Sequence, residues 1–240
     1  MKTAVCFAGT CRSLQHTYLN LSEYLVKPLG DCDIFMMISE NPHATMAEQC
    51  FNALPNNKII RIEDEPDHDM LNLVFRPNWP SGKLSSKQIY LKMIDSRRRC
   101  GEILSEYELQ KGVKYDRIVF SRLDVKYFAN VGEILEGLNM NKLYVPDFHN
   151  TFGGVIDGYN DRFAVGNREN MKIYFDLPES LAPFVKAGGQ IHAETLLKWH
   201  MIKNQIEVEK IPLRFTRVRL AGEEIDNRLR DTSTWGVSDT

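Results

Sequence analysis

Residues 115–124 read Tyr-Asp-Arg-Ile-Val-Phe-Ser-Arg-Leu-Asp. The apolar run at 118–120 predicts a buried strand that ends in two charged side chains, Arg122 and Asp124. Residues two apart in a strand point to the same side, so we expect these side chains to project together. A cation and a carboxylate are costly to bury unpaired. The pattern therefore indicates either a site for phosphate and a divalent metal or a buried structural ion pair.

Strands and helices alternate upstream of this segment. The apolar runs at 3–8 and 33–39 predict buried strands, and residues 58–62 fit a third. Between the first two strands, four apolar residues fall on one face of a helix: Leu14, Tyr18, Leu21 and Leu25. A second helix is expected over 87–110, directly before the strand at 117–124. This alternation favours an α/β sheet.

The second half of the chain adds further elements. We expect strands at 142–146, 162–166 and 207–211, and helices at 170–177 and 190–203. Between the two halves of the pattern, the polar segment 63–86 is expected to be a loop, because it contains three prolines and shows no period. Without repeats or low-complexity tracts, the chain is predicted to form one domain over 1–222, followed by a charged tail or linker at 223–240.

Composition excludes several classes of protein. The 240 residues are 43% hydrophobic and 26% charged, with a net charge of -2, which gives no bulk reason to expect nucleic-acid binding. The sequence shows neither a signal-peptide pattern nor an apolar run long enough to cross a membrane. The five cysteines have no CxxC spacing, so zinc and redox motifs are unsupported and reduced thiols in a cytosol-like compartment are expected.

The turn after the first strand contains Gly9, Thr10 and Arg12. A glycine there allows close approach of a ligand to the backbone, and the start of the next helix favours anions. Arg12 is suited to pairing with a phosphate. An ordinary strand-to-helix turn with a surface arginine is an equal alternative. The dinucleotide fingerprint GxGxxG is absent.

Asp161, His192 and Glu194 are the other candidate site residues. Asp161 could bind a sugar hydroxyl or accept its proton, or it could satisfy backbone groups in a turn. Glu194, at the predicted start of a helix, could act as a base or simply favour the helix dipole. His192 could complete a metal shell, although a lone histidine is more often a hydrogen-bonded structural residue.

Two charged runs have simpler interpretations. The arginines at 97–99 lie within the predicted second helix and are expected to form a solvated face, from which they could also steer an anion. The four acids between 64 and 69 lack the EF-hand glycine and terminal glutamate, so a solvated acidic loop is expected.

Four segments together resemble a known family. In chain order they are Ala8-Gly9-Thr10-Cys11-Arg12, residues 115–124, Gly153-Gly154 with Asn160-Asp161-Arg162-Phe163-Ala164-Val165-Gly166, and His192-Ala193-Glu194-Thr195-Leu196-Leu197. The ordered set resembles the small GT-A-fold glycosyltransferases encoded by bacteria and by large DNA viruses, including chloroviruses. The resemblance covers about residues 1–219, and its motifs are moderately specific as a set.

The resemblance implies an α/β fold of GT-A type. Its Rossmann-like half, with a mixed central sheet flanked by helices, would span about 1–125 and bind a nucleotide-sugar, and 126–222 would bind the acceptor. The implied donor-binding residues are Gly9, Thr10, Arg12, Arg122 and Asp124. Asp124 would end a DxD-type element and, with His192, hold Mn²⁺ or Mg²⁺. Arg122 departs from that motif, because it stands where the first acid is expected.

The implied activity is metal-assisted transfer of a hexose or pentose from a UDP-, GDP- or TDP-sugar to a hydroxyl of a glycan. By the same resemblance, Asp161 or Glu194 would be the base. The expected location is the cytoplasm, or the host cytoplasm if the protein is viral. Two alternatives remain: a nucleotidyltransferase or phosphotransferase on a similar sheet, and a non-catalytic glycan-binding protein that keeps the fold.

Overall fold

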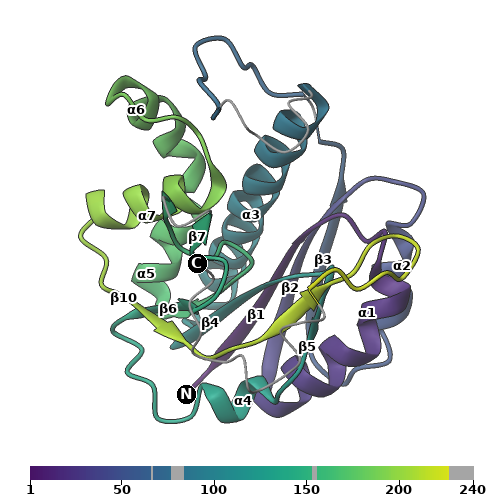
Figure 1. The fold of residues 1–240 in the computed structure, drawn as a ribbon. Helices are drawn as coiled ribbons and strands as arrows, with labels where there is room; N and C mark the ends of the chain where they lie inside the picture. The colour runs from purple at the N-terminus through teal and green to yellow at the C-terminus, as the bar shows by residue number, and fades with distance from the viewer. Residues whose placement is uncertain (66, 77–83, 153–155, 227–240) are drawn as a thin grey trace.

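The computed structural model describes residues 1–65, 67–76, 84–152 and 156–226. Its centre is a seven-stranded sheet in the order β10-β6-β9-β4-β1-β2-β3 (Figure 1). The strands, in chain order, are β1 (Thr3–Gly9), β2 (Cys32–Ser39), β3 (Lys58–Glu63), β4 (Arg117–Arg122), β6 (Leu143–Pro146), β9 (Phe163–Gly166) and β10 (Val208–Ile211). Each of these strands was predicted from the sequence, with ends that differ by one or two residues.

The sheet is mixed because one strand runs against the others. β1 is parallel to β2 and β4, and β2 is parallel to β3. β9 is antiparallel to both β4 and β6, and β10 is parallel to β6. The carboxyl ends of six strands therefore meet the amino end of β9 at one edge of the sheet. We call this edge the carboxyl edge.

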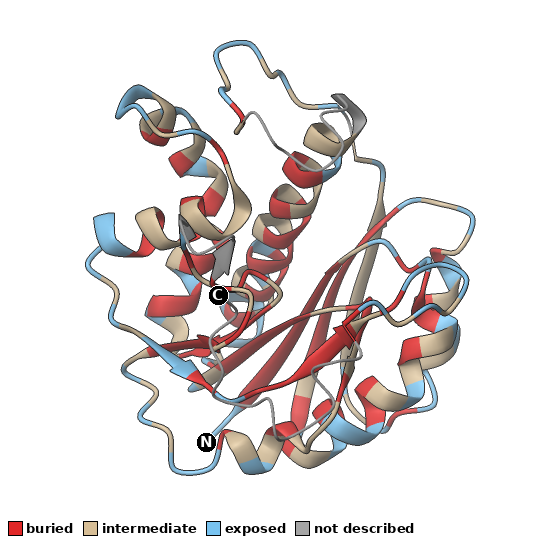
Figure 2. Ribbon diagram, viewed as in Figure 1, coloured by how far each residue is buried: buried red, intermediate tan, exposed pale blue. Residues whose placement is uncertain are grey.

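Helices cover both faces of the sheet (Figure 1). α1 (Leu14–Leu21), α2 (Thr45–Phe51) and α4 (Val131–Ile134) pack on one face, and α3 (Leu84–Lys111), α5 (Arg168–Phe175) and α7 (Ala193–Lys203) pack on the other. Alternate residues of β1 point to opposite faces of the sheet and pack in two hydrophobic cores. Val5 and Phe7 pack in the core with α1, whereas Ala4 and Cys6 pack in the core with α3. Figure 2 accordingly shows β1, β2 and β4 as buried over most of their length.

Short elements complete the described chain. The predicted first helix continues from α1 into a π-helical turn, η1 (Ser22–Val26), and a 3₁₀ turn, η2 (Lys27–Leu29). η3 (Leu177–Ser180) and α6 (Leu181–Lys186) follow α5. Two small ribbons pair β5 (Val125–Tyr127) with β11 (Phe215–Arg217) and β7 (Thr151–Phe152) with β8 (Ile156–Asp157). The Gly153-Gly154 part of the predicted motif set lies outside the described residues.

The expected tail at 223–240 begins with residues that pack on the domain. Arg217 binds Asp226 through two hydrogen bonds, of 2.8 and 3.0 Å, and Asp226 is buried. Lys126 pairs with Glu224 at 3.0 Å. The packed chain therefore extends to Asp226, and residues 227–240 lie outside the described residues. Across the described ranges, no helix is both long and apolar enough to cross a membrane.

Candidate functional site

A pocket at the carboxyl edge contains all five residues predicted to bind a donor. It encloses about 170 Å³ and is lined, among others, by Gly9, Thr10, Arg12, Arg122 and Asp124. These residues come from the ends of β1 and β4, which are neighbours in the sheet. In open α/β sheets, ligands bind outside the carboxyl ends of the strands, so the position of this pocket is that of a binding site.

Gly9 lines the pocket in a backbone conformation that favours glycine. Its φ of +112° lies in a region that side-chain-bearing residues rarely adopt, and it turns the chain sharply at the end of β1. Ser39, at the end of the adjacent strand β2, also lines the pocket, and its hydroxyl is buried. Gly9 and Ser39 thus bring the ends of two neighbouring parallel strands to the same pocket.

Arg122 and Asp124 project together, as the sequence predicted, and they bind each other. Arg122 Nε donates to Asp124 Oδ1 at 2.8 Å, and Nη2 donates to Oδ2 at 2.6 Å. Burial alone would lower the pKa of Arg122 and raise that of Asp124. The opposite charge and the hydrogen bonds of the partner side chain have a larger effect in the other direction on each group. The pKa of Arg122 is therefore raised and that of Asp124 lowered, so both groups carry their charge.

This ion pair argues against the predicted metal ligands. Both carboxylate oxygens of Asp124 already accept hydrogen bonds from a cation that stands where the first acid of a DxD element is expected. His192 Nδ1 faces Glu194 Oε2 at 3.3 Å. Within the described ranges, no three His, Cys, Asp or Glu side chains form a group that could hold a metal. The residues present therefore do not fit a resident Mn²⁺ or Mg²⁺.

A second charged group lies at the amino end of β9 and the start of α7. Arg162 Nη1 lies 3.2 Å from Glu194 Oε1 and 3.4 Å from Asp161 Oδ1. The backbone N–H of Arg122 donates to the carbonyl of Arg162 at 3.2 Å, which joins this group to the pocket residues. The structure thus brings Asp161, His192 and Glu194 together around Arg162, beside β4.

The loop before β9 holds this group by backbone contacts. Asn160 Oδ1 accepts from the N–H of Arg162 at 3.0 Å, and its amide donates to the carbonyl of Phe148 at 2.9 Å. A Cβ added to Gly158 would lie 2.6 Å from the Cβ of Glu194, so only glycine fits there. Asn160 therefore plays the turn role expected for such a residue, and Gly158 allows the loop to approach α7.

Arg97 is a site residue that the sequence interpretation placed wrongly. Instead of lying on a solvated face, it is 2% exposed, with its guanidinium 4.3 Å from the centre of the Tyr174 ring and 5.8 Å from that of Phe120. Burial raises the pKa of Asp161, but the nearby cations Arg162, Arg122 and Arg97 more than reverse this and lower it. Asp161 therefore remains ionised inside the protein, where it balances several arginines.

The sequence did contain a signal for Arg97. Its position follows the helical spacing of buried residues on the inner face of α3: Tyr90, Ile94, Gly101 and Leu104. By contrast, Arg98 pairs with Asp95 at 2.9 Å, and Arg99 pairs with Glu63. Spacing, rather than the run of three arginines, therefore identifies the one that points inward.

The acidic loop also reaches the pocket, although it was expected to be solvated. Glu65 lines the pocket and accepts a hydrogen bond from the hydroxyl of Ser96, and burial raises the pKa of its carboxyl group. Asp67 pairs with Lys92 at 2.7 Å. These contacts hold the loop against α3 beside the residues that were predicted to bind a donor.

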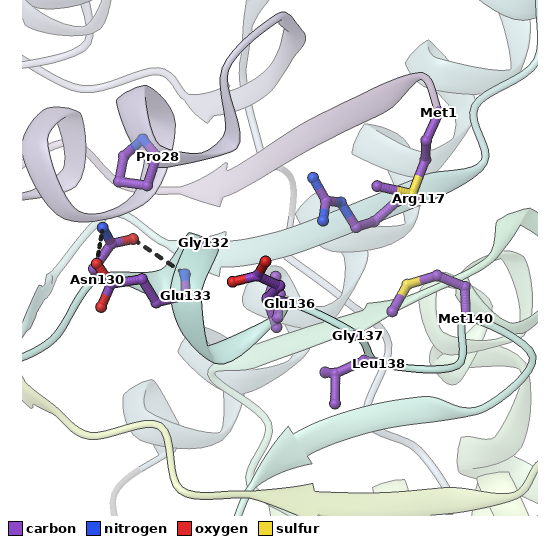
Figure 3. A pocket seen from close by; sticks show the side chains of 11 residues that line it. Met1, Pro28, Arg117, Asn130, Gly132, Glu133, Glu136, Gly137, Leu138 and Met140 are labelled. Carbon is purple, nitrogen blue, oxygen red and sulfur yellow. Dashed lines mark hydrogen bonds between the residues drawn. The ribbon is translucent and has the colours of Figure 1, made fainter.

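A larger pocket lies at the opposite edge of the sheet. It encloses about 480 Å³, and Figure 3 shows Arg117, from the start of β4, together with Met1, Glu133 and Glu136 in its lining. None of the predicted site residues lines it. We therefore place the candidate site at the carboxyl edge.

Comparisons with known proteins relate this chain to one family and to solved structures. A family model described as a domain of unknown function (DUF7796) matches residues 1–220. The chain belongs to this family. A search of curated proteins found no match.

Two solved structures are similar to this DUF7796 chain. Mouse xyloside xylosyltransferase 1, in its apo form, is 14% identical, with a TM-score of 0.49 over 88% of this chain and 85% of that chain. The apo-form glycosyltransferase GlyE of Streptococcus pneumoniae TIGR4 is 13% identical, with a TM-score of 0.47 over 88% of this chain and 45% of that chain. The mixed sheet with helices on both faces fits the α/β, GT-A-like fold expected from the sequence.

Proposed function

We propose that this protein is a glycosyltransferase that moves a sugar from a nucleoside diphosphate donor to a hydroxyl of a glycan. The observation that carries the proposal is the carboxyl-edge pocket, which contains Gly9, Thr10, Arg12, Arg122 and Asp124. The carboxylates of Asp161, which is buried, and Glu194, which is partly buried, adjoin it and pair with Arg162. A cationic pocket beside carboxylates suits a reaction in which a diphosphate leaves and a hydroxyl loses its proton.

In this proposal the donor diphosphate faces Arg12 and Arg122. The bond between the anomeric carbon and the phosphate oxygen breaks, and its electron pair leaves with the diphosphate. Guanidinium groups stabilise the charge that develops there, because they offer two parallel donors to phosphate oxygens. Asp124 orients Arg122 through its two hydrogen bonds. Since the residues present do not fit Mn²⁺ or Mg²⁺, no step is assigned to a metal.

Glu194 is our proposed base for an inverting reaction. Its side chain is 13% exposed, whereas that of Asp161 is 4% exposed. The lowered pKa of Asp161 also makes it a weak proton acceptor. In our proposal Glu194 takes the proton of the acceptor hydroxyl as that oxygen attacks the sugar, while Asp161 holds Arg162 in position. A retaining reaction would not need this base.

The test is a panel of UDP-, GDP- and TDP-sugars with glycan acceptors, assayed for release of nucleoside diphosphate. Glu194→Gln should lower kcat about 100-fold or more, since a positioned base contributes roughly 10²–10⁴-fold. The matched change Glu207→Gln, at an exposed carboxylate that pairs with Lys142, should leave kcat unchanged. Release of pyrophosphate would favour a nucleotidyltransferase instead. Absence of both turnover and donor binding across the panel would contradict the proposal.

A further inference from the structure

The segment 217–219 contacts Asp124, one of the residues that line the carboxyl-edge pocket. The N–H of Val218 donates to the carbonyl of Asp124 at 2.7 Å, and the hydroxyl of Ser13 donates to the carbonyl of Val218 at 2.8 Å. Three parts of the chain that are far apart in sequence therefore meet at Val218. Each of them carries an arginine next to the contact: Arg12, Arg122 and Arg219.

The arginines around this contact outnumber their carboxylate partners. Arg122 is balanced by Asp124, and Arg217 is balanced by Asp226. Arg12 and Arg219 are exposed, and in the described part of the chain neither forms an ion pair with a carboxylate. Their charges are therefore available to an anion that enters the pocket.

The arginines are close enough to influence one another. Although Arg219 is exposed, partial burial of its guanidinium lowers its pKa, and the charges of the nearby arginines lower it further, against the opposing effect of Asp124; these arginines are Arg217, Arg12 and Arg122. Like charges gathered at one point destabilise a folded protein unless an anion neutralises them. This geometry is typical of a site that is completed by a ligand with more than one negative charge.

We propose that Arg12, Arg122 and Arg219 bind the diphosphate of a nucleoside diphosphate directly and take the place of a divalent metal. This inference rests on the proposed function and adds how the donor is held. Guanidinium groups bind phosphate oxygens in a bidentate manner and stay charged at any pH at which the protein is folded. Asp124 is then a positioning residue, whose carboxylate fixes the guanidinium of Arg122.

The experiment measures binding of UDP, GDP and TDP to the full chain by calorimetry, in EDTA and in Mn²⁺. We expect at least one of them to bind in EDTA, with a Kd that Mn²⁺ changes by less than about threefold. Arg12→Ala and Arg219→Ala should each weaken binding about tenfold or more, because each removes one charge-assisted contact with phosphate. Both sites are exposed, so the variants should keep the thermal midpoint of the wild type.

Control variants show whether a change in Kd comes from the three arginines themselves or from the loss of any positive charge. Arg98→Ala removes an arginine from the outer face of α3, where it pairs with Asp95 and Glu102, and should leave Kd unchanged. Arg219→Lys keeps the charge without the planar fork and should recover only part of the affinity. The corresponding nucleoside monophosphates should lose less affinity than the diphosphates when Arg12 or Arg219 is removed.

The outcomes distinguish this inference from the proposed function. Binding that needs Mn²⁺, or that survives both alanine substitutions, would overturn the arginine site and leave the glycosyltransferase proposal standing. A protein that binds no nucleoside diphosphate in either condition would contradict the proposed function itself.

Discussion

Arg97 lies in the interior of the protein, whereas Arg98 and Arg99 pair with carboxylates near the surface. Its guanidinium is flanked by two aromatic rings, and its charge helps to keep Asp161 ionised. Inside a protein, removing one member of a set of balanced charges leaves the others uncompensated. The charge of Arg97 therefore helps to balance the Asp161–Arg162 group from the interior of the protein.

Replacing Arg97 with Met should destabilise the protein by about 3 kcal/mol or more, because it leaves the buried charge of Asp161 with fewer cations. Urea unfolding followed by circular dichroism measures this change. Arg98→Met, on the surface of the same helix, should cost less than about 1 kcal/mol. An equal loss in the free energy of unfolding for the two substitutions would mean that the buried charge of Arg97 does not stabilise the folded protein.

Several residues that line the carboxyl-edge pocket were predicted from the sequence to lie together, but the nearby Arg219 was not. Arg122 and Asp124 were expected on one side of a strand end, and Arg12 follows a neighbouring strand, so the rule for carboxyl ends of parallel strands brings them together. Arg219 carried no such signal. Its neighbour Val218 contacts Asp124 because β11 pairs with β5, a contact between residues about ninety positions apart that no local pattern encodes.

At the scale of elements, α3 and α5 pack closely enough to require a glycine. A Cβ on Gly101 would lie 2.6 Å from Cδ2 and 2.9 Å from Cβ of Phe175. The second distance involves an atom close to the backbone, so a change of side-chain rotamer cannot relieve it. Gly101 thus fixes the separation of the two helices despite its poor helix propensity.

Gly101→Ala should therefore destabilise the protein by about 1–3 kcal/mol, although alanine favours a helix more than glycine does. Thermal and urea unfolding provide the measurement. Combining it with Phe175→Ala should recover part of the loss, which a double-mutant cycle reports as a favourable coupling. A stabilising effect of the single change would show that α5 can move away at little cost.

The elements that sequence predicted well are those with strong local patterns. Strands buried on both faces appear as continuous apolar runs, and β1, β2 and β4 were found in this way. The long helix α3 was found from its length and spacing. Four-residue α4 and the short strands β5 and β11 were missed, because their stability comes from tertiary contacts rather than from their own sequences.

For the molecule as a whole, His200 links stability to pH. Its side chain is buried between Ile173 and Ser180: Nε2 lies 2.7 Å from the carbonyl of Ile173, and Nδ1 lies 2.5 Å from Ser180 Oγ. Burial lowers the pKa of the imidazole below its ordinary value of 6.5, against the opposing effect of the Ile173 carbonyl. The folded protein therefore prefers the neutral ring.

The sign of the pH dependence follows from this shift. As pH falls below about 6.5, the unfolded chain takes up a proton at His200 before the folded protein does, so the free energy of unfolding decreases. Urea unfolding between pH 5.0 and 8.5 should show this loss in the wild type and a smaller one in His200→Gln. Above pH 7.5 the two curves should run parallel. Equal slopes below pH 6.5 would rule out a contribution from His200.

The order of the strands has a consequence for synthesis on the ribosome. Thr3 pairs with Cys32 of β2 on one side and with Arg117 of β4 on the other. β1 therefore cannot pair with β4 until residues 117–122 have been made, which is about half of the chain. Until then, one edge of this apolar strand has free backbone groups that can pair with another nascent chain. In the same way, the other side of β4 stays unpaired until β9 has been made. Chains that terminate before residue 117 should therefore aggregate, and slower elongation ahead of that point should lower the yield of folded protein.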